Sequence, residues 1–245
     1  MFVFLATLSN YTFHRIFPVY YHNYKTHPSP LFKWTIQHLN FLTVLFLSSL
    51  LLSVFFFLDA NFTVKIVLFA LALLTMAYSL PLFKWKNKLI RLRDFSYLKI
   101  ILIATTWAIV CGNLVLLNDE TNYSVKQHLA VFIEKFLFLI AITIPFDIRD
   151  FEQDKIEAVK TIPNTLGIQQ SISIAIFCLI GSLPMVLFSN ANCYYKLAYF
   201  TSYLYTCILI IATTNKKSEM FYLFYLDAAF ILLGVLMFIV YLVLS

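Results

Sequence analysis

The densest acidic cluster of the chain lies in Ile144-Pro-Phe-Asp147-Ile-Arg149-Asp150-Phe-Glu-Gln-Asp154-Lys155, directly after an apolar run. Asp147, Asp150 and Asp154 fall at positions i, i+3 and i+7, which share one face of an α-helix. Carboxylates that converge there repel one another unless a cation joins them. Magnesium prefers oxygen ligands and is often held by one or two carboxylates plus substrate phosphates. The stretch predicts a magnesium and diphosphate site at a membrane surface; the alternative is a solvated loop of mixed charge.

The composition around this stretch indicates the class of protein. Of the 245 residues, 61% are hydrophobic and only 12% are charged, and the mean hydropathy is +0.83. Long, continuous apolar runs predict membrane-spanning helices, whereas an outer-membrane barrel would show short alternating segments. The net charge of +6 then reports topology and contact with membrane lipid, not nucleic acid. We expect an all-α integral membrane protein with a single domain over residues 1–245.

The apolar runs predict how many helices cross the membrane. Residues 1–9 are too short for a span of about 20 residues, so they count as a partial helix before a polar loop at 15–37. We therefore expect a bundle of about eight transmembrane helices. Full spans are predicted at residues 38–58, 61–81, 97–117, 129–146, 170–189, 196–213 and 221–243.

The positions of lysine and arginine predict the orientation of these spans. Fourteen of the 18 basic residues fall in loops on the side that carries the acidic cluster, three fall in the opposite loops, and one lies within a span. Cytoplasmic loops are enriched in Lys and Arg. We therefore expect a multi-pass protein of the cell (inner) membrane with its site on the cytoplasmic face.

The acidic cluster and the Lys160-Thr161 pair that follows it resemble the second aspartate-rich motif of the UbiA-type membrane prenyltransferases. The stretch Ala77-Tyr78-Ser79-Leu80-Pro81 is similar to the tyrosine-containing loop of that family, and Lys99 with Trp107 fits its pattern in the next span. The order and spacing of the spans agree with the family over nearly the whole chain, provided that the first of nine family helices is missing. The resemblance therefore implies a UbiA-like bundle of nine helices minus one.

The resemblance also implies an activity. Such enzymes move an isoprenyl group from an isoprenyl diphosphate to an aromatic or other lipid-soluble acceptor, with Mg²⁺ on the diphosphate. Diphosphate leaves well only when metal and basic groups neutralise its developing charge. By resemblance, the catalytic and metal-binding residues are Asp147, Asp150 and Asp154. The residues expected to meet diphosphate oxygens are Arg149, Lys160, Tyr78, Lys84, Asn10 and Arg15.

Two of these assignments have plain alternatives. Tyr78 is also where an interfacial aromatic residue is expected, and Lys84 is also an ordinary positive charge of a cytoplasmic loop. The family often places its basic residue four positions after the tyrosine, and that position is Leu82 here.

The first aspartate-rich motif of the family departs further from the pattern. It corresponds here to Asn10-Tyr11-Thr12-Phe13-His14-Arg15, in which Tyr11 and His14 stand where aspartates are expected. A neutral imidazole adds no negative charge, whereas Arg15 can hold phosphate directly. Either the site works with one metal and more direct basic contacts, or the chain is a catalytically degenerate homologue that binds an isoprenoid or a partner enzyme without turnover.

Glu134, Lys135 and Asp227 lie within predicted spans, where ionisable residues are functional candidates. Glu134 and Lys135 are adjacent and point about 100° apart on a helix, so we expect them not to pair and to snorkel toward the outer membrane surface. A small transporter that uses Glu134 and Asp227 is the alternative from another class of function. Transporter helices are often broken at Gly or Pro, and the chain has only 4 Gly.

Overall fold

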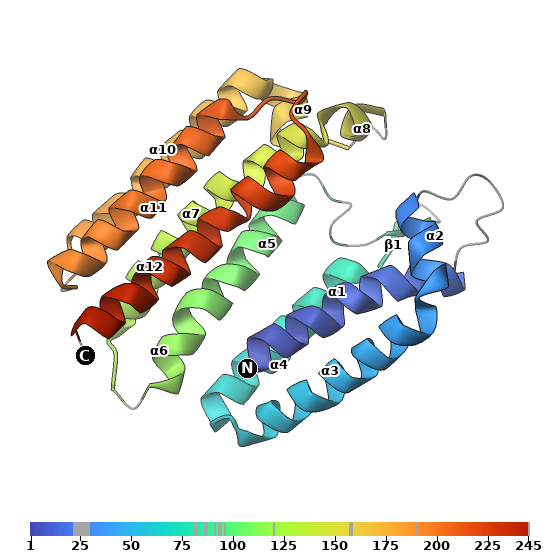
Figure 1. Ribbon diagram of the computed structural model, residues 1–245, viewed down its shortest axis with the longest axis horizontal. Coiled ribbons are helices and arrows are strands. Elements are labelled where there is room, and N and C mark those ends of the chain that lie inside the picture. The colour runs from blue at the N-terminus through green and yellow to red at the C-terminus, as the bar shows by residue number, and fades with distance from the viewer. Residues whose placement is uncertain are drawn as a thin grey trace. The chain divides into compact units, whose positions relative to one another are not determined.

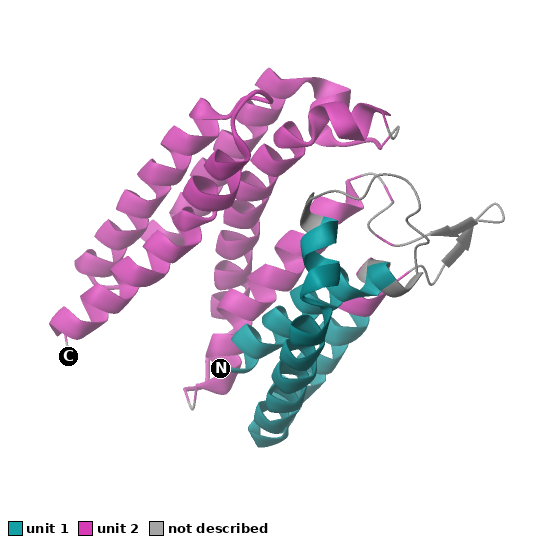
Figure 2. Cartoon of the chain, turned by 45° about the vertical axis from the view of Figure 1, so that its right-hand side comes forward, with its two compact units in different colours: residues 1–74 teal, residues 75–245 magenta. Residues whose placement is uncertain are grey.

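The computed structural model divides into two compact units, residues 1–74 and 75–245, each of which is described by itself (Figure 2). The structure describes residues 1–21, 30–80, 83–85, 88–90, 92, 95, 97–119, 121–156, 159–189 and 191–244.

The first unit is built on a pair of long helices. Its elements are α1 (Phe2–Tyr21), α2 (Pro30–Gln37), α3 (Leu39–Asp59) and most of α4 (Phe62–Ser79). The helices α1 and α3 pack along each other in opposite directions, with ring centroids 6.4 Å apart for Phe2 and Phe57 and 5.8 Å apart for Phe13 and Phe46 (Figure 1). Aromatic side chains therefore hold this pair together along much of its length.

The second unit contains the remaining elements. Its only described strands form a short antiparallel hairpin, in which Phe83 lies opposite Ile90. Its helices meet end to end in several places, and two of the joints are π-helical. The elements in order are β1 (Phe83–Trp85), β2 (Lys88–Ile90), α5 (Leu98–Ala108), a π-helical segment (Ile109–Asn113), α6 (Leu114–Asn118), α7 (Val125–Arg149), α8 (Phe151–Ile156), α9 (Ile162–Leu166), α10 (Ile168–Leu187), α11 (Cys193–Ala212), a second π-helical segment (Phe221–Leu226) and α12 (Ala228–Leu244).

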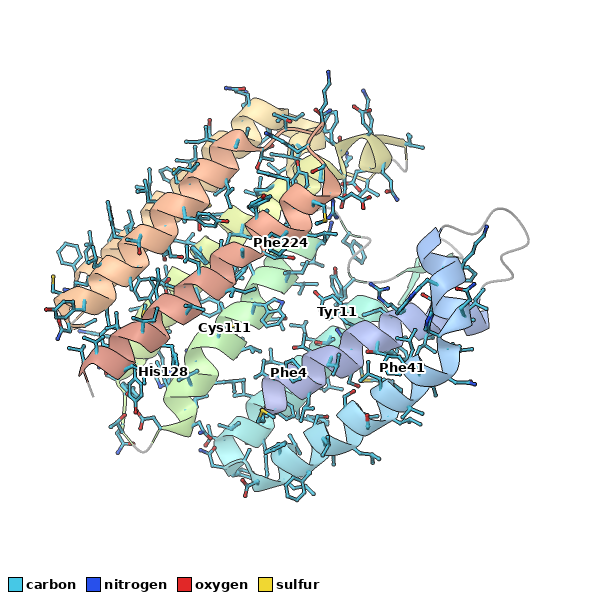
Figure 3. All side chains as sticks on the ribbon, viewed as in Figure 1. Phe4, Tyr11, Phe41, Cys111, His128 and Phe224 are labelled. Atoms are coloured by element: carbon cyan, nitrogen blue, oxygen red, sulfur yellow. The ribbon has the colours of Figure 1, made fainter. Side chains whose placement is uncertain are left out.

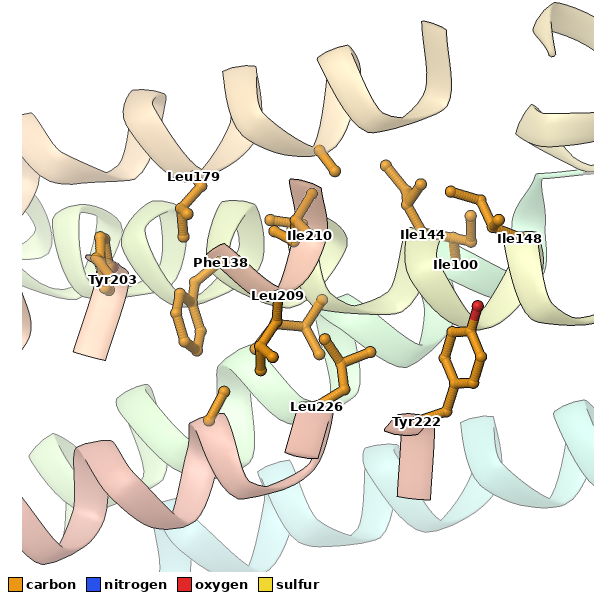
Figure 4. Close-up of a cluster of buried hydrophobic side chains, with 14 residues drawn as sticks. Ile100, Phe138, Ile144, Ile148, Leu179, Tyr203, Leu209, Ile210, Tyr222 and Leu226 are labelled. Carbon is orange, nitrogen blue, oxygen red and sulfur yellow. The ribbon is translucent and has the colours of Figure 1, made fainter. Parts of the chain in front are cut away.

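Helix α7 is the centre of the second unit. It begins at Ser124, whose side chain and that of Gln127 form a reciprocal capping box. It packs against α5 on one side and α10 on another, and also contacts α11. Its inward residues join side chains of the neighbouring helices in one buried apolar cluster (Figure 4). Labelled members of this cluster are Ile100, Phe138, Ile144, Ile148, Leu179, Tyr203, Leu209, Ile210, Tyr222 and Leu226.

Within the part of the chain that the structure describes, six helices are long and apolar enough to cross a membrane, at 39–59, 98–118, 125–149, 168–187, 193–212 and 221–244. Each matches a predicted span, so the prediction of a multi-pass helical membrane protein is confirmed. The predicted span at 61–81 corresponds to α4, whose apolar part, Phe62–Tyr78, is shorter than the six long helices. Many large apolar side chains on these helices are exposed, among them Phe41 (62%) and Phe224 (65%) (Figure 3), as lipid-facing residues are.

The prediction for the N-terminal residues is wrong in one respect. Residues 1–9 are not a separate partial segment, because α1 continues without a break to Tyr21. Much of the expected loop at 15–37 is helical, because Arg15 belongs to α1 and residues 30–37 form α2, while residues 22–29 lie outside the described residues. Extending an existing helix costs little compared with starting one, so a few polar residues do not end it.

Candidate functional site

The beginning of α5 and the end of α7 meet through a buried ion pair. The Lys99 ammonium donates a hydrogen bond to Asp147 Oδ1 at 3.0 Å. The Asp147 side chain is only 2% exposed and that of Lys99 is 32% exposed. Ile100, Ile144 and Ile148 are buried beside these two residues in the sequence. A charged side chain among such residues requires an opposite charge, so the pair fixes where α5 and α7 meet.

The three aspartates do not lie on one continuous helix. Helix α7 ends at Arg149, Asp150 caps it with φ −84° and ψ 5°, and α8 begins at Phe151. One bond bridges the break, because the Asp150 carbonyl accepts from the Asp154 amide at 2.9 Å. Asp147 is buried and Asp154 is half-buried. The single helix expected from the spacing is therefore interrupted at Asp150, between α7 and α8.

Arg149 uses its guanidinium within the protein. Its Nε and Nη2 donate to the two carboxylate oxygens of Asp150 at 2.7 and 3.0 Å. The guanidinium carbon lies 5.3 Å from the ring centroid of Phe146 and 5.8 Å from that of Tyr222. Arg149 therefore joins the end of α7 to the π-helical segment that precedes α12, and its expected contact with diphosphate stays a prediction. Asp227, which is exposed, interacts electrostatically with the same guanidinium.

Lys99 is the residue around which predicted site residues gather. Besides Asp147, the hydroxyl of Tyr78 and the carboxylate of Asp154 lie within electrostatic range of its ammonium. Tyr78 is at the end of α4 and belongs to the second unit. The Asp150 carboxylate also lies within electrostatic range of the Asp147 carboxylate. The structure thus brings Tyr78 and all three aspartates of the motif to one end of the second unit.

The segment after α8 adds polar groups at this end. Lys160 is exposed, and Thr161 beside it is only 5% exposed. In the described part of the chain, neither the Thr161 hydroxyl nor the Asn164 side-chain oxygen has a hydrogen-bond partner. Tyr97 donates to the Thr165 hydroxyl at 3.0 Å, so α9 is tied to the start of α5. Buried polar groups are normally satisfied, so these two are exceptions within the described residues.

Three other predicted residues belong to the first unit or have a side chain that is not described. Asn10 and Arg15 belong to α1 of the first unit, where Asn10 is half-buried and the Arg15 guanidinium lies 6.0 Å from the ring centroid of Trp34. Tyr11, which stands where the family has an aspartate, is 64% exposed (Figure 3). Lys84 is in strand β1, and its side chain falls outside the described residues.

The acidic residues do not form a metal cage by themselves. Within the described ranges, no group of three or more His, Cys, Asp or Glu side chains is placed to hold a metal ion. The geometry therefore offers no support for a magnesium ion resident among three aspartates. One or two carboxylates are enough where a diphosphate supplies further oxygens. Asp147 and Asp150 are three residues apart in the sequence, and each of their carboxylates has a cationic partner in the described residues, Lys99 and Arg149 respectively.

A second polar group lies deep within the apolar part of α7. The Lys135 ammonium lies 2.8 Å from Glu134 Oε2 and donates to the Tyr199 hydroxyl at 2.9 Å. Tyr203 donates to Glu134 Oε1 at 2.5 Å, and its ring stacks on Phe138 with centroids 4.9 Å apart. Glu134 is only 4% exposed and lies about 14 Å along the helix from its first residue.

This arrangement corrects the sequence-based expectation for these residues. Glu134 and Lys135 do pair, and neither snorkels to the surface. The flexible lysine stem allows the ammonium to reach back to the neighbouring carboxylate, and two hydroxyls from α11 complete the hydrogen bonding. The sequence does contain one indication of this polar group. Tyr199 and Tyr203 are four residues apart, so their hydroxyls share one face of a helix.

Comparisons of the chain with protein-family models, with curated proteins and with solved structures found no match. The resemblance to the UbiA-type prenyltransferases therefore stays a prediction, and the function has to be argued from the site.

Proposed function

We propose that the protein is an integral-membrane prenyltransferase, which moves an isoprenyl group from an isoprenyl diphosphate to an aromatic or other lipid-soluble acceptor. The observation that carries the proposal is the buried Lys99–Asp147 pair at the end of an apolar helical unit. This end also holds the other motif aspartates, exposed Lys160 and the Thr161 hydroxyl, which has no hydrogen-bond partner among the described residues. A ligand with a charged head and a long apolar tail matches that combination.

The proposed transfer breaks one bond in such a ligand and forms another. The bond between the allylic carbon and the diphosphate oxygen breaks, the acceptor forms a bond to that carbon, and the acceptor loses a proton. In the proposal, Lys99, Lys160 and Tyr78 bind the diphosphate, and Lys84 and Arg149 are further candidates for its oxygens. The contacts expected for Asn10 and Arg15, which belong to the first unit, stay predictions. Asp147 and Asp150 would hold a magnesium ion bound together with the diphosphate, and the ion would neutralise charge on the leaving group.

The proposed location follows from the same residues. Lys99, Lys155 and Lys160 lie at the end of the second unit that collects the acidic cluster. Because Lys and Arg mark cytoplasmic loops, we place this end on the cytoplasmic face of the cell membrane.

The experiment is release of diphosphate by the full chain in lipid nanodiscs. Farnesyl and geranylgeranyl diphosphate would be supplied with a panel of aromatic acceptors, with Mg²⁺ or with EDTA. We expect release that requires both Mg²⁺ and an acceptor, and that is lost in Asp147→Asn. Asp119→Asn is the matched control, since Asp119 is an exposed carboxylate bonded to Thr121 and Tyr123 in the loop before α7. No release with any donor would contradict the proposal.

One observation favours a second candidate function. Asp147 and Asp150 already have cationic partners within the protein, as expected for a homologue that binds an isoprenyl lipid or a partner enzyme without turnover. Saturable farnesyl diphosphate binding that depends on Asp147, without release of diphosphate, would favour this function over transfer.

A further inference from the structure

The first unit carries positive charge that its own side chains do not neutralise. Its only acidic residue is Asp59, which ends α3 about 30 Å along that helix from its start. Arg15 in α1 and Lys33 in α2 are both exposed. Among the described residues, neither of these two side chains takes part in an ion pair. Both charges are therefore free to meet an anion from outside the chain.

Trp34 is the centre of a small group of cationic and aromatic side chains, which we call the Trp34 group. The Arg15 guanidinium carbon lies 6.0 Å from the centroid of the Trp34 ring, and Lys33 precedes Trp34 in α2. His38 stacks on the Trp34 ring with centroids 4.5 Å apart, and its Nδ1–H donates to the Trp34 carbonyl at 2.9 Å. Helix α2 contacts both α1 and α3, and Thr35 is buried (Figure 1). The Trp34 ring is thus held in place while the residue stays 42% exposed.

The Trp34 group lies where a membrane span begins. Leu39 starts α3, one of the long apolar helices, directly after His38. Phe41 in the first turn of α3 is 62% exposed, as a lipid-facing residue is. The end of a span lies at the level of the lipid head groups, where tryptophan is enriched. The anions available to the Trp34 group at this depth are therefore lipid phosphates.

The charge of the group selects among lipids. Guanidinium and ammonium groups donate strong hydrogen bonds to phosphate oxygens. A choline head group also brings a cation, for which the first unit has no carboxylate at this end. Basic residues next to a span attract anionic lipids, because those lipids bring negative charge without a compensating cation.

We propose that the Trp34 group is a binding site for the head group of an anionic phospholipid. Arg15 and Lys33 bind the phosphate, and Trp34 packs against the glycerol and the upper part of the acyl chains. The site belongs to the first unit alone and does not rest on the proposed prenyl transfer.

The test measures contact between Trp34 and lipid, with the full chain in nanodiscs. Trp85→Phe and Trp107→Phe together leave Trp34 as the only tryptophan. Lipids brominated near the head group quench tryptophan fluorescence on contact, so brominated phosphatidylglycerol is compared with brominated phosphatidylcholine at equal content. We expect stronger quenching by phosphatidylglycerol. Arg15→Gln or Lys33→Gln should lower this selectivity about fivefold, the contribution of one basic side chain at an anionic surface.

A second measurement avoids the tryptophan substitutions. The chain with all three native tryptophans is purified in detergent from mixed lipids, and the lipids that stay bound are identified by mass spectrometry. We expect phosphatidylglycerol to be enriched over phosphatidylcholine, and the enrichment to be lost when Arg15→Gln and Lys33→Gln are combined.

Two variants show whether the selectivity belongs to the Trp34 group. Lys65→Gln removes one positive charge from the first turn of α4, which follows the far end of α3, and it should keep the selectivity. Arg15→Lys should keep part of it, because lysine retains the charge and loses the planar fork. Raising the salt concentration should weaken the selectivity, since the charges of the group are exposed and are screened by ions.

Three results would overturn the lipid site. The first is equal quenching of Trp34 by the two lipids. The second is undiminished selectivity in the combined Arg15→Gln and Lys33→Gln variant, which would place the anionic lipid elsewhere. The third is loss of the selectivity when inorganic diphosphate is added with Mg²⁺, which would show that a soluble anion occupies the group. Diphosphate release from farnesyl diphosphate is measured separately, so the proposed function stands or fails independently of these results.

Discussion

At the scale of single residues, buried charges in the second unit lie next to opposite charges. Lys99 and Asp147 form one such pair, Lys135 and Glu134 another. On insertion scales, a lone charged side chain at the centre of a membrane helix costs about 2.5–3.5 kcal/mol. Pairing reduces that cost, and tyrosine hydroxyls supply the remaining hydrogen bonds to Glu134 and Lys135. The second pair has every group engaged, so we assign it to the stability of the bundle.

The Tyr203 hydroxyl should contribute more to the free energy of unfolding than a tyrosine hydroxyl bonded to a neutral group. Tyr203→Phe removes the hydrogen bond to the buried Glu134 carboxylate, and bonds to charged groups contribute about 1.5–3 kcal/mol. We expect a clear fall in the free energy of unfolding in mixed micelles. Tyr205→Phe is the control, because the exposed Tyr205 bond goes to the neutral Tyr225 carbonyl. An equal loss of unfolding free energy in the two variants would show that the charge of Glu134 does not strengthen its hydrogen bond with Tyr203.

At the scale of elements, the sequence determines the helices more completely than their ends. The apolar runs predicted six spans to within a few residues, because composition alone decides whether a helix can lie in lipid. The sequence pattern did not predict the break between α7 and α8 at Asp150, because such a break depends on local hydrogen bonds. The pairing of Glu134 and Lys135 was missed because it depends on hydroxyls from α11. Within the candidate site, the motif residues were identifiable, but the contact between Lys99 and Asp147 required the packing of α5 on α7.

Gly112 allows the π-helical segment Ile109–Asn113, which follows α5, to pack closely against α7. A Cβ built there would lie 2.7 Å from Val131 Cγ1 and 3.3 Å from Lys135 Cγ. Gly112→Ala should therefore lower the free energy of unfolding by about 1–3 kcal/mol through overpacking.

Gly234 in α12 provides the control for this substitution. A Cβ at this position meets nothing within 4 Å, so Gly234→Ala should be neutral or slightly stabilising. The measurement is thermal unfolding of both variants beside the wild type. A Gly112→Ala protein as stable as the Gly234→Ala protein would show that a methyl group fits between the π-helical segment Ile109–Asn113 and α7.

At the scale of the whole molecule, the ends of the second unit differ in charge. The end with the Lys99–Asp147 pair also carries Lys155, Lys160 and Lys217, while Lys126 at the start of α7 and Lys196 at the start of α11 lie at the other end. Such an asymmetry orients membrane proteins with the basic end in the cytoplasm. The orientation matters for the proposed function because isoprenyl diphosphates are charged and do not cross lipid unaided.

Cysteine labelling on intact cells tests this orientation. One version of the chain keeps only exposed Cys193 at the start of α11; the other lacks all native cysteines and carries Lys155→Cys in α8. A membrane-impermeant maleimide should label Cys193 from outside, and should label the Lys155→Cys protein only after permeabilisation. The opposite pattern would place the candidate site outside the cell.

The most direct test of the account is equilibrium binding of labelled farnesyl diphosphate to the wild-type chain in nanodiscs with Mg²⁺. We predict saturable binding that inorganic diphosphate displaces, that farnesol displaces poorly, and that Asp147→Asn loses, because the charged head is held at the Lys99–Asp147 pair. Binding that farnesol displaces as well as farnesyl diphosphate does, or that survives in Asp147→Asn, would contradict a diphosphate site at this end of α7.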